Sequence, residues 1–307
     1  MTAPTLVITG ASGFVGTHLA RLAAEDGYRV WAVGREAEPP ATLAASCDRY
    51  FGADLAEGWP IDDPVDAVVH LAGLAAVGPS FAEPQRYIEV NSGIMTAMCE
   101  ALLRADHPCK VVVVSSGSVY EPAESEPIGE DAPTIPTSPY AVAKLLVESQ
   151  ARYYSRRGLD TLVARPFNHI GPGQSRGFLV PDITSALRGL APGEPLRVGN
   201  LDTARDYTDV RDVARAYLAL VAAPQHRSFV YNICSGRSRS GREILASVAD
   251  ALGRPVPSTE VDSTRLRPGD PMCIIGSAAS LRNEFGWAPR IDVATSIRDY
   301  VVELGAG

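Results

Sequence analysis

Tyr140 and Lys144 lie four residues apart in the segment SPYAVAK, which spans residues 138–144. Ser138 is a favoured helix N-cap and Pro139 suits the first helical position, so this segment predicts the start of a helix. Residues four apart share one helical face, and an ammonium beside a phenol favours the phenolate. The pair therefore predicts proton transfer by Tyr140, tuned by Lys144. The alternative is an ordinary pair of neighbours on a surface helix.

The composition favours the chemical interpretation. The chain has 28 Lys and Arg residues in total, and only Lys110 and Lys144 are lysines. Lysine is a compact ammonium whose pKa moves readily on burial, whereas arginine stays charged. A lysine in so arginine-rich a chain indicates a role that arginine performs poorly.

A glycine-rich turn follows the first predicted strand, Thr5–Thr9, and precedes a predicted helix over Phe14–Glu25. Its glycines are spaced G-x-x-G-x-x-G. This spacing allows a tight turn and lets a pyrophosphate approach the backbone at a helix N-terminus. The turn predicts a dinucleotide cofactor, which we expect to contact Gly10, Ser12, Gly13, Phe14 and Val15.

The end of the second predicted strand indicates which cofactor is bound. NAD-specific sites usually place an acid there to bond the ribose 2′-hydroxyl. Here Gly34 takes that place and Arg35 follows, so we count no carboxylate that would repel a 2′-phosphate. A guanidinium suits such a phosphate. We therefore expect NADP(H), with NAD(H) as the second choice; the alternative for Arg35 is a solvated surface arginine.

Short β-branched runs alternate with helical stretches through the first two-thirds of the chain. Uninterrupted apolar runs such as VVVV at 111–114 indicate a parallel sheet covered on both faces. After about residue 167 the chain is richer in Pro and Gly. We expect an α/β fold with a Rossmann-type doubly wound parallel sheet and a smaller C-terminal α/β substrate domain. Residues 1–166 would form the NADP-binding domain, to which about 204–232 would return, and 167–307 the substrate domain.

Bulk properties exclude several classes of protein. The net charge of −8 and the isoelectric point near 5.2 argue against general nucleic-acid binding, which needs a basic face. No apolar run approaches the ~18 residues of a membrane span, and the N-terminus lacks the basic start of a signal peptide. The five cysteines show no CxxC spacing, so no zinc site or disulfide framework is expected. We expect a cytoplasmic protein with no nucleic-acid or membrane partner.

The glycine turn, the serines after the VVVV run and the Tyr-x-x-x-Lys spacing together resemble the extended short-chain dehydrogenase/reductase family, over essentially the whole chain. This resemblance implies a catalytic set of Ser116, Tyr140 and Lys144. Ser116 would bind a sugar carbonyl and Tyr140 would donate the proton. The implied cofactor contacts also include Tyr140, Lys144, the HLAG loop (Leu71, Ala72, Gly73), and Asp54 and Leu55 near the adenine.

Later segments narrow the resemblance. RPFNHIGPGQ (165–174), ARDYTDVRDV (204–213) and RLRPGD (265–270) resemble the branch that acts on GDP-mannose derivatives. Arg205 and Arg267 would bind the diphosphate, because the arginine fork matches phosphate oxygens. The alternatives are surface ion pairs for the arginines and a packed loop histidine for His169. The substrate contacts implied are Ser80, Ser116, Asn168, His169, Arg205 and Arg267.

The expected activity is NADPH-dependent reduction of a 4-keto-6-deoxy nucleotide sugar, such as GDP-4-keto-6-deoxymannose to GDP-rhamnose or a related deoxysugar. Dehydratases of the family have acids just after the catalytic Ser or Thr. Here Gly117 and Ser118 stand there, and neither is a general base near neutral pH. The alternatives are an epimerase, a dehydratase as the less favoured choice, and a non-catalytic NADP-sensing regulator. We expect a homodimer paired through helices.

Overall fold

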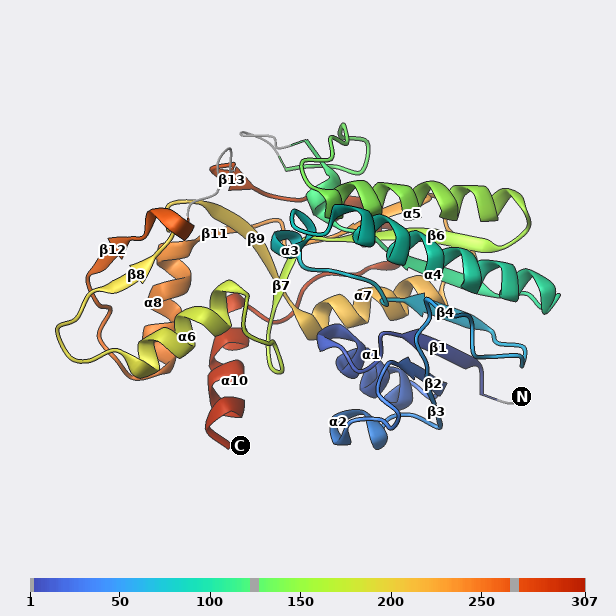
Figure 1. The fold of residues 1–307 in the computed structure, drawn as a ribbon, viewed down its shortest axis with the longest axis horizontal. Coiled ribbons are helices and arrows are strands. Elements are labelled where there is room, and N and C mark those ends of the chain that lie inside the picture. Colours follow the sequence, from blue (N-terminus) through green and yellow to red (C-terminus); the bar gives the residue numbers. More distant parts are fainter. Residues whose placement is uncertain (1–2, 122–126, 266–270, 307) are drawn as a thin grey trace.

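The computed structural model describes residues 3–121, 127–265 and 271–306, which contain a seven-stranded, all-parallel sheet (Figure 1). The strand order is β3-β2-β1-β4-β5-β6-β10, with every neighbouring pair parallel. The Rossmann-type sheet predicted from the sequence is confirmed. Its strands are β1 (Thr5–Thr9), β2 (Arg29–Gly34), β3 (Arg49–Gly52), β4 (Ala67–His70), β5 (Lys110–Val114), β6 (Asp160–Pro166) and β10 (Val230–Ile233).

Helices cover both faces of this sheet, and each face has its own apolar core. Successive strand residues point to opposite faces, so Leu6 and Ile8 enter one core and Val7 enters the other. The first core includes side chains of α1 (Phe14–Glu25) and α7 (Val210–Ala222). The second includes those of α4 (Pro84–Arg104) and α5 (Pro139–Arg156). The short helices α2 (Ala41–Ala44), α3 (Val77–Ser80) and α9 (Ala279–Phe285) complete this part.

A smaller part stands at the left of Figure 1 and has a third core. Its four-stranded sheet joins β7, β9, β11 and β13, and a separate two-stranded sheet joins β8 and β12. The helices α6, α8 and α10 pack on these strands. The bounds are β7 (Asn168–Ile170), α6 (Leu179–Gly189), β8 (Leu196–Val198), β9 (Ala204–Asp209), β11 (Ser238–Ser240), α8 (Gly241–Ala251), β12 (Thr259–Val261), β13 (Cys273–Ile274) and α10 (Val293–Ala306).

The chain passes directly from one sheet system to the other at Asp209. This residue ends β9 in the small sheet and is the N-cap of α7, which packs in the first core beside α1. β10 then enters the large sheet. Within the segment 204–232, β9 therefore stays with the small sheet, whereas α7 and β10 lie with the large one. The domain division at residue 166 stays a prediction.

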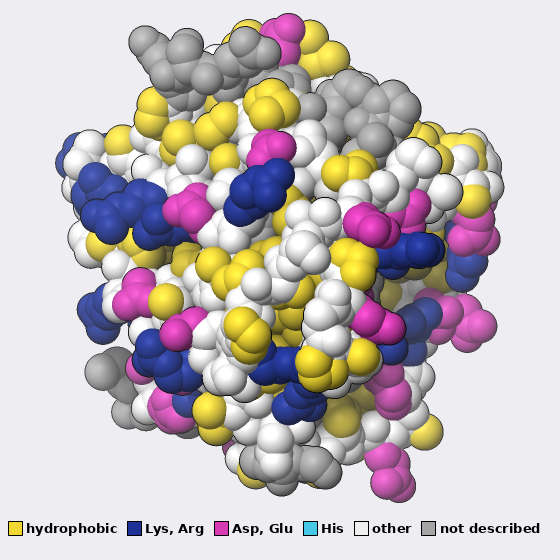
Figure 2. Space-filling model, turned by 90° about the vertical axis from the view of Figure 1, so that its left-hand side faces the viewer, with side chains coloured by type: hydrophobic (Ala, Val, Ile, Leu, Met, Phe, Trp, Pro, Cys, Tyr) yellow, Lys and Arg dark blue, Asp and Glu magenta, His cyan; other side chains and the backbone are white. Residues whose placement is uncertain are grey.

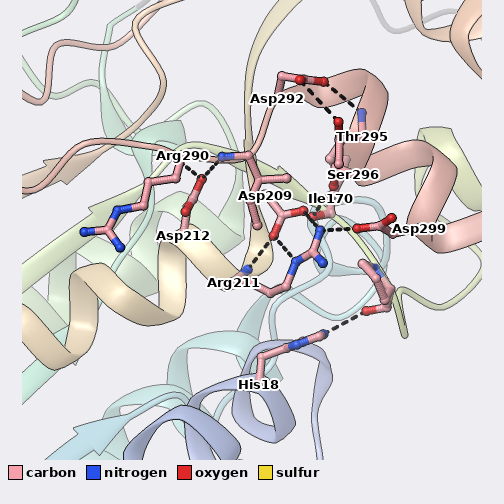
Figure 3. A network of polar contacts seen from close by, with 12 residues as sticks. His18, Ile170, Asp209, Arg211, Asp212, Arg290, Asp292, Thr295, Ser296 and Asp299 are labelled. Carbon is pink, nitrogen blue, oxygen red and sulfur yellow. Dashed lines mark hydrogen bonds and ion pairs between the residues drawn. The ribbon is translucent and has the colours of Figure 1, made fainter. Parts of the chain in front are cut away.

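A network of charged side chains ties the two parts together at this crossing (Figure 3). Arg211 on α7 donates to Asp209 through Nε at 2.8 Å and pairs with Asp299 on α10 at 2.8 Å. His18 on α1 lies 2.9 Å from the carbonyl oxygen of Pro172, in the segment after β7. α1 and α7 are therefore bonded to two separate segments of the smaller part.

The surface on the side of the smaller part carries both signs of charge. Figure 2 shows basic and acidic side chains interspersed around apolar ones on this face. Exposed ion pairs of this part include Arg197–Glu260 and Arg242–Asp202. Such mixing provides no continuous basic field on the face shown. In the described ranges no helix is long and apolar enough to cross a bilayer, and a cytoplasmic location stays a prediction.

Candidate active site

Three predicted catalytic residues meet at the carboxyl end of β5. Ser138 caps α5 by accepting a hydrogen bond from the Ala141 N–H at 3.1 Å, so the helix begins where its sequence predicts. This start turns Tyr140 and Lys144 toward the sheet, where they are only 7% and 8% exposed. Tyr140 shares a hydrogen bond with Ser116, which lies two residues after β5. The three polar groups can therefore act on one small group.

The electrostatics of Tyr140 differ from the prediction. We expected Lys144 to favour the phenolate, but burial raises the pKa of Tyr140 and outweighs the lowering by the hydrogen bond with Ser116. An apolar environment disfavours a charged phenolate, which explains the correction. Burial also lowers the pKa of Lys144 to about 8. In the protein alone the pair is thus a neutral phenol beside a readily titrated ammonium, and a neutral phenol is the form that can donate a proton.

The glycine turn forms a cradle between β1 and α1. Gly10 has a φ of +67°, and a Cβ there would lie 3.0 Å from the Ala72 nitrogen. A Cβ at Gly16 would lie 2.5 Å from the Gly10 oxygen. The N-cap of α1 is Gly13, which supplies no side-chain cap, so the first amides are not satisfied by a side chain. The turn therefore fits a dinucleotide pyrophosphate, with Ser12, Phe14 and Val15 at its rim.

The HLAG loop lies against this turn. The N–H of Leu71 donates to the Thr9 carbonyl at 3.3 Å, and the N–H of Ala72 donates to the Thr9 hydroxyl at 3.1 Å. Gly73 has a φ of +147°, a conformation that other residues rarely adopt. The loop after β4 and the turn after β1 thus share one edge of the sheet, as expected for two parts of one cofactor site.

The predicted adenine contacts follow β3 on the same edge of the sheet. Asp54 is exposed and accepts a hydrogen bond from the Ala56 N–H at 2.9 Å. Leu55 is 7% exposed and packs in the second core. Asp54 is the more accessible of the two, and Leu55 can offer little beyond its backbone.

A carboxylate that the sequence analysis did not count lies beside Ser12. Glu36 Oε2 accepts a hydrogen bond from Ser12 Oγ at 2.8 Å, and its main-chain oxygen accepts one from the Tyr50 hydroxyl at 2.9 Å. Gly34 permits this arrangement, because a Cβ there would lie 2.5 Å from the Tyr50 hydroxyl oxygen. Arg35 is exposed. The inference that no acid stands at this strand end is therefore wrong, and the 20-residue spacing from Gly16 to Glu36 was the missed signal.

Two predicted sugar contacts lie on β7, next to the cofactor turn. Asn168 is exposed, and the His169 ring stacks on Phe14 with centroids 5.9 Å apart and an angle of 12°. His169 Nδ1 lies 3.1 Å from the Phe167 carbonyl oxygen, and burial lowers the pKa of His169. The histidine is therefore a neutral group that joins β7 to the turn.

The other predicted substrate residues have different surroundings. Arg205 on β9 donates from Nη1 to the carbonyl oxygens of Ala204 at 2.8 Å and Pro271 at 2.9 Å. Arg267 lies outside the described residues. Ser80 is fully buried and donates to the Val77 carbonyl at 2.6 Å. Its hydroxyl stabilises the end of α3, and its role as a substrate contact stays a prediction.

Comparison with known proteins places this site in a family. A model of the NAD dependent epimerase/dehydratase family matches residues 6–234. The chain belongs to this family. A curated member, the GDP-6-deoxy-D-mannose reductase of Pseudomonas aeruginosa, is 35% identical over 95% of this chain and 94% of its own length. Another, the UDP-glucose 4-epimerase of Azospirillum brasilense, is 32% identical over 94% of this chain and 88% of its own.

Solved structures of family members have the same fold. RMD from Pseudomonas aeruginosa, complexed with NADPH, matches with a TM-score of 0.83 and 33% identity over 99% of both chains. MoeE5 in complex with UDP-glucose and NAD matches with a TM-score of 0.85 and 29% identity, over 98% of this chain and 99% of that one. Both nicotinamide cofactors thus occur among family members.

Proposed function

We propose that the protein reduces the 4-keto group of a 6-deoxy nucleotide sugar with NADPH. The favoured substrate is GDP-4-keto-6-deoxymannose, giving GDP-rhamnose or a related deoxysugar. The observation that carries this proposal is the buried, protonated Tyr140, hydrogen-bonded to Ser116 and one helical turn from Lys144. The similarity to a GDP-6-deoxy-D-mannose reductase supports the choice of substrate.

In the proposed reduction, each of the three catalytic residues has a separate role. Ser116 donates to the carbonyl oxygen and stabilises the charge that develops there. Tyr140 transfers its phenolic proton to that oxygen, which general acid catalysis makes about 10²–10⁴-fold faster. The Lys144 ammonium then stabilises the phenolate that remains. NADPH, held at the N-terminus of α1 and along residues 71–73, supplies the hydride when it is bound.

The packing around Gly117 argues against dehydration. A Cβ at Gly117 would lie 2.9 Å from the Phe167 ring, so the acid that a dehydratase needs has no room there. Ser118 is exposed and donates its hydroxyl to Ser116 Oγ at 3.0 Å. This arrangement supports the carbonyl-binding role of Ser116 and offers no base for the elimination of water.

An epimerase is the second candidate, because several relatives in the family are UDP-sugar 4-epimerases. An epimerase would use the same Ser116, Tyr140 and Lys144 and return the hydride to the other face of the sugar. The difference is in stoichiometry, since a reductase consumes one NADPH for each sugar and an epimerase consumes none.

The deciding experiment supplies the protein with NADPH and GDP-4-keto-6-deoxymannose, follows NADPH by absorbance, and identifies the sugar product. Stoichiometric loss of NADPH with a reduced sugar is the expected result. Interconversion of UDP-glucose and its 4-epimer without net loss would favour the epimerase. Formation of a 4-keto sugar from GDP-mannose would identify a dehydratase. Tight NADPH binding without turnover of any sugar would indicate a non-catalytic NADP-sensing regulator.

We also propose a homodimer that pairs through α4 and α5. Three large apolar side chains are exposed on α5, namely Val142 at 40%, Leu146 at 36% and Tyr153 at 55%. The two helices lie together on the outer face at the top of Figure 1. Light scattering of the wild type should give twice the chain mass, and Leu146→Glu should give the single-chain mass.

A further inference from the structure

Glu148 occupies the centre of a buried polar cluster directly behind the proposed catalytic residues. It lies one helical turn after Lys144 on α5, and its side chain and that of Arg165 are each 6% exposed. Arg165 on β6 binds the Glu148 carboxylate in a bidentate manner. Its Nε donates to Oε1 at 2.8 Å and its Nη2 donates to Oε2 at 2.6 Å. No role assigned so far uses this pair.

Glu148 and Lys144 attach α5 to two consecutive residues at the end of β5. Glu148 Oε1 accepts a hydrogen bond from Ser115 Oγ at 2.5 Å. Lys144 Nζ donates to the Val114 carbonyl oxygen at 2.8 Å. Ser115 directly precedes Ser116 in the chain. The two contacts therefore set how far α5 can slide along β5, and with it the position of Tyr140 relative to Ser116.

Arg165 is itself held from the opposite side. Its Cζ lies 4.6 Å from the centroid of the Tyr120 ring, which provides a cation–π contact. The Tyr120 hydroxyl donates to Asn232 Oδ1 at 2.7 Å. The guanidinium therefore has little freedom, and the carboxylate that it binds is fixed in turn.

Glu148 is also the negative group that faces Lys144. The other titratable groups around the ammonium are neutral or positive: burial lowers the pKa of His70 on β4 to about 3, burial raises the pKa of Tyr140, and Arg165 is a cation. Burial lowers the pKa of Lys144 to about 8, and the Glu148 carboxylate acts in the opposite direction. With a neutral residue at position 148, nothing would oppose the effect of burial, and the pKa of Lys144 would fall further.

We propose that Glu148, clamped by Arg165, is a positioning residue that keeps the Lys144 ammonium charged and α5 in register with Ser116. The kinetic part of this inference rests on the proposed function, because it needs turnover. The electrostatic part does not, because the protonation of Lys144 can be measured without a substrate.

The scarcity of lysine makes that measurement direct. The chain has two lysines, and in a Lys110→Arg background lysine labelled with ¹³C at Cε gives a single NMR signal, from Lys144. Lys110 lies at the other end of β5, where it donates to the Ala223 carbonyl and pairs with Asp160. Glu148→Gln keeps the shape of the side chain and an oxygen for Ser115. It should lower the titration midpoint of Lys144 by about one pH unit.

The matched control is Glu100→Gln. Glu100 on α4 also pairs with an arginine, Arg157, but its side chain is 34% exposed and it is absent from the groups that act on Lys144. This variant should leave the Lys144 midpoint in place. An unchanged midpoint in Glu148→Gln would overturn the electrostatic role, whatever reaction the protein catalyses.

The pH profile of turnover separates this role from simple structural support. With a Lys144 midpoint one pH unit lower, the turnover rate of Glu148→Gln should be about eightfold below that of the wild type at pH 8.5. At pH 6 the two rates should be almost equal. A merely structural defect would reduce turnover by the same factor at every pH. Such a uniform loss, with the Lys144 midpoint in place, would contradict the proposal.

Glu148→Asp tests the register independently, and it serves if Glu148→Gln does not fold. It keeps the charge but is one methylene shorter, so it draws the carboxylate away from Ser115 and Arg165. Lys144 should titrate nearly as in the wild type while turnover falls at all pH values. Full turnover in Glu148→Asp would show that the contact does not position α5.

Discussion

The Nζ of Lys144 lies 5.8 Å from the centroid of the Tyr140 ring, and both side chains are almost closed off from solvent. Burial acts on the two groups in opposite senses, because it raises the pKa of the phenol and lowers that of the ammonium to about 8. Below about pH 8 the pair therefore consists of a neutral acid and a positive neighbour. This is the protonation state that a carbonyl reductase needs before the proton moves.

Replacing either group should reduce turnover without loss of the fold. Tyr140→Phe should lower kcat by about 10²–10⁴-fold but still bind NADPH, because it removes the proton donor and keeps the ring. Lys144→Arg should also be impaired, since a guanidinium cannot take the place of a compact buried ammonium. Steady-state kinetics and NADPH fluorescence measure the two effects. The control is Tyr153→Phe, at an exposed tyrosine of the same helix, and wild-type rates in both test variants would remove the pair from the mechanism.

The pH dependence of kcat/KM should show one alkaline limb. Lys144 is charged below its pKa of about 8 and loses its proton above it, whereas the raised pKa of Tyr140 keeps the phenol protonated through this range. Activity should thus fall as the pH rises through about 8, with a slope of one proton. Lys144→Arg should shift this limb upward, because arginine does not deprotonate. A wild-type profile that stays flat to above about pH 9 would contradict the assignment.

Cofactor choice should respond in opposite directions to two adjacent residues. Arg35→Ala should weaken NADPH binding by about tenfold and hardly affect NADH, because a charged hydrogen bond to the 2′-phosphate is lost. Glu36→Gln should strengthen NADPH binding by about threefold, because the carboxylate beside Ser12 repels that phosphate. Dissociation constants for both cofactors provide the test. Glu38→Gln, at an exposed acid of the same segment, should change neither dissociation constant. If the ratio of the NADPH and NADH dissociation constants were the same in all variants, the roles of Arg35 and Glu36 would be refuted.

The buried carboxylate of Asp212 should contribute strongly to stability. It is fully buried, and its Oδ2 accepts hydrogen bonds from the backbone N–H groups of Arg290 at 2.7 Å and Ile291 at 2.9 Å (Figure 3). It also pairs with Arg215. Asp212→Ala should lower the free energy of unfolding by about 3–5 kcal/mol, because these partners lose their acceptor. Urea denaturation measures this, and the control Asp202→Ala, at an exposed ion pair, should leave the free energy of unfolding nearly unchanged.

Strong local signals predicted the large sheet and its first helices. β1 and α1 have the predicted bounds because the glycine turn separates them, and Ser138 with Pro139 fixes the start of α5. α4 starts at Pro84, where proline is favoured in the first turn, and α3 is a separate short helix before it.

Several elements of the smaller part were less predictable because they are short or lack a cap. β7, β8 and β11 have three residues each, which is too few for an alternating pattern to appear. α6 begins after Phe178, which supplies no side-chain cap. That start signal was therefore absent for α6, whereas Ser240 and Glu243 form a capping box at the start of α8.

The site shows the same division between local and distant contacts. Tyr140 and Lys144 are neighbours on one helix, so their spacing alone indicated a pair. The contact of Glu36 with Ser12 joins residues 24 apart in the chain, and that of Arg165 with Glu148 joins residues 17 apart. In the sequence alone, a glutamate on a helix resembles a solvated surface charge. Only the packing of α5 on β5 and β6 shows that Glu148 is buried.

The direct passage from β9 into α7 at Asp209 limits how such a protein can be recombined. In the described ranges the chain moves between the larger and the smaller part at five places: around Phe167, at Asp209 and Val210, over residues 234–237, between β13 and α9, and between α9 and α10. None of these crossings is a spacer that could be cut and rejoined freely. The smaller part is therefore not a separable module, and a graft of another sugar specificity would need five junctions within bonded structure. New specificities on this scaffold are more accessible through single substitutions on β7 and β9 than through exchange of a whole module.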